Sequence, residues 1–176
     1  MIRLINPLDS KADFEKLTDS LWRFVNDPDS FKFLSYSLIN FDKKEIEEMT
    51  LRHKENGIDY LVNDKDGVFS GLLAIKRIKS KGFELFLLVV DKSNQKSGIG
   101  QSLMTECIRI ASKEKFKCVD SLVFADNKDM LRLLIKNDFI PIDIQYNARA
   151  DGADIIKLRK YLITRADKIE NIATTT

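Results

Sequence analysis

The chain has 176 residues, which suffices for one domain with a sizeable hydrophobic core. A composition of 44% apolar and 32% charged residues excludes a disordered or fibrous chain, and a net charge of +2 argues against a nucleic-acid partner. The two cysteines, Cys107 and Cys118, lack the spacing of a zinc site or a disulfide framework, so we expect small buried side chains. We expect no secretory leader and no membrane span, which favours a cytoplasmic protein.

The N-terminal part of the chain predicts a strand at residues 2–5 and then a helix that Ser10 caps and that runs to about residue 25. Apolar residues recur on this helix with a period of 3.6, at Phe14, Leu17, Leu21, Trp22 and Val25. Residues 26–41 are irregular and aromatic, a composition typical of a functional loop.

A second helix begins at a capping box. Asp42 caps the amide three residues on while Glu45 reaches back, and Asn56 and Gly57 end the helix. This helix carries His53, the only histidine in the chain, which we expect to be a surface residue.

The middle of the chain predicts an antiparallel meander of three strands. The strand-like runs fall at residues 58–62, 68–78 and 83–90. Turns separate them at residues 63–67 and 79–82.

The second half alternates helices and strands. After a polar loop, a helix carries an apolar stripe at Ile99, Leu103, Cys107 and Ala111. A strand, a short helix capped by Asp126 or Asn127, and two terminal strands follow. These elements fall at residues 119–124, 127–136, 139–146 and 154–158.

The resulting order is β-α-α-β-β-β-α-β-α-β-β. Because the middle strands are joined as hairpins while helices separate the others, we predict an α/β (α+β) fold with a mixed, mostly antiparallel twisted sheet flanked by helices. Residues 1–162 form a single domain in this interpretation, and residues 163–176 form a peripheral C-terminal tail.

The junction between the strand at residues 83–90 and the next helix carries the pattern Gln95-x-x-Gly98-x-Gly100. A helix start offers unpaired amides and a partial positive charge, and glycine lets an anion approach closely, so the pattern predicts a pyrophosphate cradle. The structural alternative is a tight turn before a helix. A Rossmann fingerprint would need glycine in place of Leu103, and no Gly-Lys-Ser/Thr is present, which argues against nicotinamide cofactors and ATP.

This pattern and its surroundings resemble the GNAT family of N-acetyltransferases. In that family a strand ends in Val or Ile, and the motif Gln/Arg-x-x-Gly-x-Gly/Ala begins five residues later. Here Val90 ends the strand and Gln95 begins the motif. A further strand, an Asn at a helix start and a closing Phe follow, matched by residues 119–124, Asn127 and Phe139. The resemblance covers about residues 67–139 and implies a GNAT-like acyl-CoA N-acyltransferase fold with acetyl-CoA as the acyl donor.

The resemblance also implies which residues bind acetyl-CoA. Backbone amides of the glycine loop would hold the pyrophosphate, and backbone groups of the preceding strand would pair with the pantetheine arm, one of them polarising the thioester carbonyl. Asn127 would contact the cofactor and cap its helix. The implied residues are Leu88, Val89, Val90, Gln95, Lys96, Ser97, Gly98, Ile99, Gly100, Gln101, Ser102 and Asn127.

Glu84 is the candidate catalytic base. A primary amine has a pKa of about 10.4 and must lose a proton before it attacks a thioester. In the histone-acetylating branch of the family, the base is a glutamate six residues before the terminal Val or Ile, the place of Glu84 relative to Val90. Strand alternation predicts that Glu84 shares a face with Phe86, Leu88 and Val90. Partial burial of the carboxyl should raise its pKa. The alternative is a surface ion pair with Lys79 or Lys81.

The general acid is a departure from the family pattern. Many members place a Tyr seven residues after the Asn, where this chain has Leu134. The leaving thiolate could receive its proton from Tyr36, Tyr146, another group or water. Alternatively, the thiolate leaves without a proton. A covalent route through Cys107 is disfavoured because that residue belongs to a buried helix face, so we expect direct transfer in a ternary complex.

The predicted function is acetyl transfer to a primary amine on a small molecule, peptide or protein. The first helix, residues 26–41 and the last two strands would hold the acceptor, whose identity stays open among polyamine, amino acid, antibiotic, peptide N-terminus and protein lysine. The alternative is a non-catalytic acyl-CoA-binding or sensing module. A nucleic-acid-directed enzyme is disfavoured by the charge balance, no metal is expected, and a homodimer is open.

Overall fold

Local capping signals set the helix boundaries in the computed structural model, which describes residues 1–7, 9–36, 38–65, 67–78 and 82–162. Ser10 accepts the Asp13 amide at the start of α1 (Lys11–Val25). Asp42 and Glu45 form the predicted capping box of α2 (Lys43–Glu55), with both hydrogen bonds at 2.8 Å. Gly98 begins α3 (Ile99–Lys113), and Asn127 caps α4 (Lys128–Lys136).

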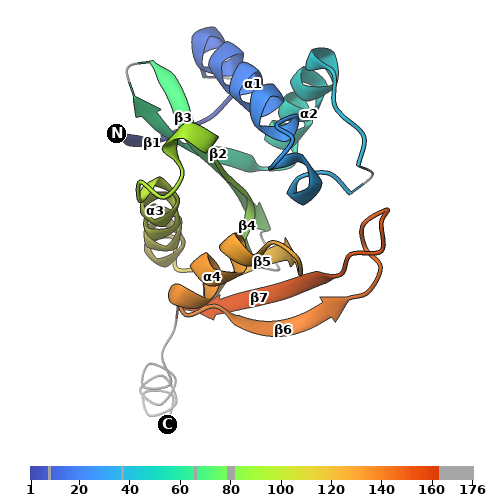
Figure 1. Ribbon diagram of the computed structural model, residues 1–176. Helices are drawn as coiled ribbons and strands as arrows, with labels where there is room; N and C mark the ends of the chain where they lie inside the picture. The colour runs from blue at the N-terminus through green and yellow to red at the C-terminus, as the bar shows by residue number, and fades with distance from the viewer. Residues whose placement is uncertain (8, 37, 66, 79–81, 163–176) are drawn as a thin grey trace.

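Seven strands form one sheet in the order β1-β2-β3-β4-β5-β7-β6 (Figure 1). The strands are β1 (Ile2–Ile5), β2 (Ile58–Lys65), β3 (Val68–Ile78), β4 (Gly82–Val90), β5 (Cys118–Phe124), β6 (Ile140–Gln145) and β7 (Ile155–Tyr161). β4 and β5 pair in parallel and every other neighbouring pair is antiparallel. The predicted mixed, mostly antiparallel sheet is therefore confirmed, although β2 continues to Lys65 through part of the expected turn.

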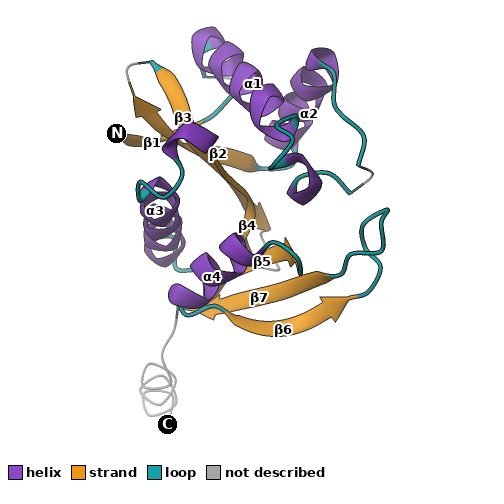
Figure 2. Cartoon of the chain, viewed as in Figure 1, coloured by secondary structure: helices purple, strands orange, loops and turns teal. Residues whose placement is uncertain are grey.

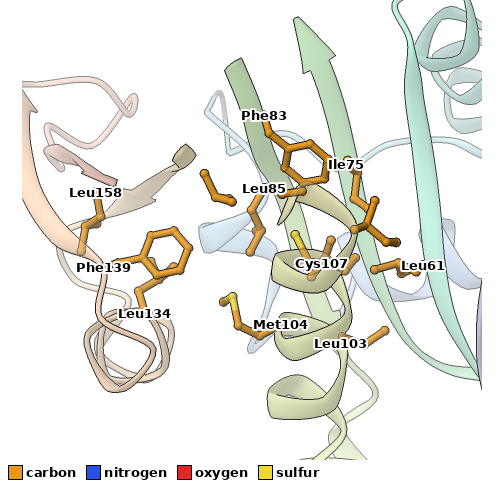
Figure 3. Packing of buried hydrophobic residues seen from close by; sticks show 14 of the residues in the cluster. Leu61, Ile75, Phe83, Leu85, Leu103, Met104, Cys107, Leu134, Phe139 and Leu158 are labelled. Atoms are coloured by element: carbon orange, nitrogen blue, oxygen red, sulfur yellow. The ribbon is translucent and has the colours of Figure 1, made fainter. Parts of the chain in front are cut away.

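Helices cover both faces of the sheet (Figure 2). α1 and α2 pack on the face formed by β1–β4, in a cluster that includes Leu21, Ile46 and Tyr60. α3 and α4 cover the opposite face in a second cluster, in which Cys107 and Met104 of α3 lie near Leu85 of β4 (Figure 3). The α1–α2 cluster contains no described residue of β5, β6 or β7, so that half of its face has no helix over it.

Two side chains on the first helices differ from expectation. Trp22 lies outside the buried stripe of α1 and keeps 44% of its surface exposed. His53, expected at the surface, is half-buried on α2, where Nδ1 hydrogen-bonds the hydroxyl of the buried Tyr60. Burial lowers the pKa of His53 to about 4, so this histidine is neutral at physiological pH.

Two predicted segments lie outside the described residues: most of the turn at 79–82, including Lys79 and Lys81, and the C-terminal tail at 163–176. Among the helices of the described residues, none is long and apolar enough to cross a bilayer.

Candidate active site

A gap between β4 and β5 forms the centre of the candidate site. The two strands pair in register at three positions, which end at Leu85 opposite Ser121. β4 then continues to Val90 and β5 to Phe124 without further pairing between them. The backbone of β4 from Phe86 to Val90 therefore presents an unpaired edge toward β5, where an extended ligand can add hydrogen bonds as a strand would.

A β-bulge in β4 corrects the predicted orientation of Glu84. The register with β3 pairs Ala74 with Leu87 and Ile75 with Leu85, which leaves Phe86 as the extra residue. Side-chain alternation shifts at this point. Leu88 packs on the α3 side, whereas Phe86 contacts His53 of α2, with ring centroids 5.3 Å apart.

Glu84 therefore shares the α1–α2 face with Phe86, and Leu88 and Val90 lie on the other face. Simple alternation was wrong because it assumes that no residue is inserted between positions 84 and 88.

The Glu84 carboxylate has no hydrogen bond or ion pair within the described part of the chain. Its row in the sheet continues through Lys76 of β3, Asp120 of β5 and Arg159 of β7. Burial raises the pKa of Glu84, and the charge of Lys76 partly offsets the rise. The raised pKa of Glu84 agrees with the prediction, and the charges that act on this carboxylate are those of Lys76, Asp120 and Lys157.

The neighbouring carboxylate, Asp120, is already paired with two cationic side chains. Asp120 accepts from Arg159 at 2.6 and 2.8 Å, and from Lys157 at 3.2 Å, and these hydrogen bonds hold its pKa below its usual range. Of the two carboxylates in this row, Glu84 is the one free to take a proton.

The glycine loop between β4 and α3 presents a row of free amides. No backbone N–H from Lys96 to Gln101 donates to another described group, and the first helical bond joins the Ser102 amide to the Gly98 carbonyl at 3.0 Å. Gln95 holds the loop to the strand end, because its side-chain amide donates to the Val90 carbonyl at 3.2 Å. This arrangement is suited to bind an anion at the positive end of the helix dipole.

The two glycines serve different purposes. Gly98 has φ = +87°, in the left-handed region that glycine tolerates without strain. Gly100 is helical, and a Cβ there would meet Leu88, Val90 and Leu133 side chains at 3.7–3.8 Å, which is ordinary contact. Protein packing therefore does not require glycine at position 100. The missing side chain leaves space beside the free amides for a ligand.

A cleft of about 570 Å³ joins the loop, the β4 edge and α4. The predicted binding residues among its walls are Leu88, Val89, Val90, Gln95, Lys96, Gly98, Gly100, Gln101 and Asn127. Ser97, Ile99 and Ser102 do not line the cleft. The Ser97 hydroxyl donates to the Asn94 carbonyl, and Ile99 packs against the core cluster. The cleft also takes in residues of the α1–α2 loop, which the sequence assigned to the acceptor (Asp29, Ser30, Phe33 and Leu34), and residues of α4, which the sequence pattern did not indicate (Asp129, Met130, Leu133 and Lys136).

Asn127 can serve two purposes at this cleft. Its side-chain oxygen accepts the Met130 amide at 3.2 Å and so caps α4. The side-chain NH2 group makes no hydrogen bond within the described residues and is available to a ligand in the cleft.

Neither position 134 of α4 nor the cysteine of α3 supplies an acid or nucleophile to the site. Leu134 is fully buried beside Phe139, so the place of the family tyrosine belongs to the core (Figure 3). Cys107 is also fully buried, and burial raises the pKa of its thiol to about 12. A covalent route through this thiol would need both exposure and ionisation.

A clamp around Arg149 draws three loops together beside the site, and no motif in the sequence indicated it. Arg149 is 4% exposed and donates to Asp126, Asp151 and the Lys32 carbonyl. Its guanidinium lies 4.8 Å from the ring centroid of Phe124, the last residue of β5. The α1–α2, β5–α4 and β6–β7 loops therefore have fixed positions relative to the gap.

A larger cleft of about 740 Å³ lies between α1 and the β2–β3 turn. Its walls include Trp22, Phe41 and Val68 but neither Glu84 nor the glycine loop. The chemistry points to the smaller cleft, because the free amides and the unpaired strand edge meet there.

Comparisons with known proteins identify the family. The model of the acetyltransferase (GNAT) family matches residues 15–139. A curated relative, the 5′-nucleotidase SurE of Methanococcus maripaludis (strain C5 / ATCC BAA-1333), is 43% identical over 60 residues, or 33% of this chain and 22% of the relative. The chain thus spans about a fifth of the length of that relative.

Solved structures share the fold at low sequence identity. The ribosomal-protein-alanine N-acetyltransferase from Brucella melitensis is 18% identical, with a TM-score of 0.73 over 92% of this chain and 99% of that one. YncA from Salmonella typhimurium, solved with acetyl-CoA, is 15% identical, with a TM-score of 0.72 over 94% and 95%. The ribosomal-protein-S18-alanine N-acetyltransferase from Escherichia coli is 15% identical, with a TM-score of 0.70 over 93% and 96%. Because the family match spans well over half of its residues, the chain belongs to the GNAT family of acetyltransferases.

Proposed function

We propose that this protein transfers the acetyl group of acetyl-CoA to a primary amine by direct attack in a ternary complex. The observation that carries the proposal is the continuity of the cleft: free amides at the start of α3 lead to the unpaired edge of β4. Together they match a ligand with a pyrophosphate at one end and an extended amide-containing arm at the other. The space at Gly100 supports the fit, because protein packing leaves it unfilled.

Acetyl-CoA is a substrate of the proposed reaction. Amides from Lys96 to Gln101 would hold its pyrophosphate, the β4 edge at Leu88–Val90 would hold the pantetheine arm, and Asn127 would donate to it. Ser97 and Ile99 would contribute through the backbone, whereas the Ser102 amide already donates to the Gly98 carbonyl. An amide of β4 near the bulge would stabilise negative charge on the carbonyl oxygen of the thioester.

Glu84 is the proposed base. It lies on the opposite face of the sheet from the cleft, beside the point where β4 and β5 part, so the amine would approach from the α1–α2 side. Its raised pKa and its free carboxylate suit the removal of a proton from the acceptor. The open face over β5 and β7, where Leu122 is 45% exposed, gives the acceptor room.

The second candidate is a non-catalytic acyl-CoA-binding module, which is favoured by the burial of Leu134 at the family's acid position. The two candidates share the cleft and differ in turnover.

The first test is a thermal shift with acetyl-CoA, with AMP as the control. At 100 times its Kd a ligand adds ~2.7 kcal/mol of stability, which should raise Tm by several degrees for a domain of this size. Release of free thiol with a panel of amines then separates enzyme from binding module. No shift at millimolar acetyl-CoA would refute both candidates, and a shift without turnover across the panel would refute the enzyme.

A further inference from the structure

The proposed reaction needs a proton donor for the leaving sulfur, and position 134 of α4 cannot provide one. When the C–S bond of the thioester breaks, its electron pair goes to sulfur, and a proton on sulfur makes thiol the leaving group. Leu134 has no exposed surface and packs in the core cluster with Phe139 and Leu158. A proton donor must therefore be a residue other than position 134 that reaches the gap between β4 and β5.

Tyr36 of the α1–α2 loop lies at this gap. Its ring meets Phe124, at the end of β5, edge-on with centroids 5.2 Å apart. The Glu84 carboxylate of β4 is near enough that its charge, together with burial, raises the pKa of Tyr36. The phenol is 54% exposed, and its hydroxyl makes no hydrogen bond within the described residues. Tyr36 thus contacts one wall of the gap and interacts with Glu84 on the other.

The loop position is fixed on both sides of the ring. The Tyr36 carbonyl accepts the Ala150 amide at 2.9 Å, and Arg149 donates to the Lys32 carbonyl at 2.8 Å. Phe124 contacts both the Tyr36 ring and the Arg149 guanidinium. The hydroxyl is therefore held near the gap by the fold instead of by a flexible surface loop.

We propose that Tyr36 is the general acid of this enzyme, in place of the family tyrosine whose position is occupied here by Leu134. The inference rests on the proposed acetyl transfer. Glu84 first takes a proton from the ammonium and passes it to bulk water. The neutral amine nitrogen then forms the N–C bond and gives a further proton to Glu84, while the sulfur leaves with the electron pair of the C–S bond and takes the phenol proton of Tyr36. The phenolate recovers a proton from Glu84 through water, which returns both groups to their starting states and leaves an amide and a thiol.

The neighbourhood of Glu84 and Tyr36 links the two proton transfers. While Glu84 is ionised, its charge keeps the proton on Tyr36. Once Glu84 has taken the proton of the amine, that charge is gone and the Tyr36 phenol becomes a stronger acid than it was while Glu84 was ionised. The donor is thus strengthened at the stage of the reaction when sulfur needs its proton.

The kinetic test compares Tyr36→Phe with Tyr146→Phe, which removes the hydroxyl of a tyrosine 69% exposed on the β6–β7 loop. Tyr36→Phe should lower kcat with acetyl-CoA about 100-fold, with each KM within about twofold of wild type. Tyr146→Phe should match wild type. An aromatic thiolate is a weak base and leaves readily without a proton. With an acetyl thioester of an aromatic thiol as the acetyl donor, the loss of kcat in Tyr36→Phe should therefore nearly vanish. An equal loss with both donors, or a loss confined to the KM of the amine, would overturn the acid role.

A second measurement does not depend on turnover. The difference in phenolate absorbance between wild type and Tyr36→Phe, followed against pH, gives the ionisation of Tyr36. The same difference in a Glu84→Gln background should titrate at lower pH, because the carboxylate charge is removed. An unchanged titration would place Tyr36 away from Glu84 and refute the proposal. A failed thermal shift of the wild type with acetyl-CoA would instead refute the proposed function.

Discussion

Glu84 illustrates how a single position acquires chemistry from its neighbours. Its carboxylate is half-buried and free of hydrogen bonds, while Asp120, one strand away in the same row, is held by Arg159 and Lys157. Burial therefore raises the pKa of Glu84, and the ion pairs lower the pKa of Asp120. Two carboxylates of nearly the same chemistry are thus assigned different roles by their surroundings.

Replacement of Glu84 by Gln should lower kcat/KM for the amine about 100-fold at neutral pH. The loss should shrink above about pH 10, where a primary amine is already neutral. In wild type the acid limb of the pH profile should lie above the usual range of a glutamate, because activity needs the ionised carboxylate and its pKa is raised. The pH dependence of kcat/KM measures both effects.

The matched control is Glu55→Gln at the exposed end of α2, which should match wild type at every pH. Equal activity of Glu84→Gln and wild type across the pH range would remove Glu84 from the mechanism.

At the scale of the element, α4 joins stability to binding through its cap. The side-chain oxygen of Asn127 accepts the Met130 amide, and the rest of its amide is free toward the cleft. A cap depends on a side-chain oxygen close to the backbone, which both Asn and Ser carry, whereas a donor to the ligand depends on the NH2 group. Different substitutions can therefore separate the two roles.

Asn127→Ala should cost about 1 kcal/mol of unfolding free energy and lower Tm by about 2–4 °C. Asn127→Ser keeps a capping oxygen and should retain stability within a few tenths of a kcal/mol. Both variants should bind acetyl-CoA more weakly, as measured by calorimetry, because both lack the NH2 group. Wild-type affinity in Asn127→Ser would mean that the residue acts as a cap alone.

At the scale of the whole molecule, Arg149 joins loops that are distant in sequence. The α1–α2, β5–α4 and β6–β7 loops meet at its guanidinium, which holds the pKa values of Asp126 and Asp151 below their usual range. A carboxyl whose pKa is lowered by folding contributes stability above its unfolded pKa and loses that contribution as the pH falls through its folded pKa. The clamp should therefore weaken in acid.

Arg149→Met keeps the aliphatic length of the side chain and removes its charge. It should lower the unfolding free energy at pH 7, since Asp126 and Asp151 lose their partner. The difference from wild type should begin to shrink below about pH 4, near the unfolded pKa of an aspartate. Urea unfolding at several pH values measures this difference.

Arg132→Met is the control, because Arg132 and its partner Asp129 are 75% and 86% exposed. An exposed pair of this kind contributes about 0–1 kcal/mol. A stability difference for Arg149→Met that stays constant down to pH 2 would show that packing, and not charge, explains the clamp.

The sequence by itself determined the elements and the glycine loop. Capping residues such as Asp42 and Asn127 act on amides within one helical turn, and apolar periodicity reports directly on the buried face of a helix or strand. The glycine loop is equally local, since its free amides follow from a strand end, a short turn and a helix start. Such signals can be identified in a single sequence because the interacting groups lie within a few residues of one another.

Only the tertiary structure decided what surrounds Glu84. The bulge at Phe86 arises from pairing with β3, and it turns Glu84 to the face opposite Leu88. Tyr36 and Glu84 are 48 positions apart in the chain, and Arg149 reaches Lys32 across 117. Contacts between segments so distant depend on how the sheet twists and where its loops close. Those properties belong to the packing of the whole chain, and no local pattern of residues encodes them.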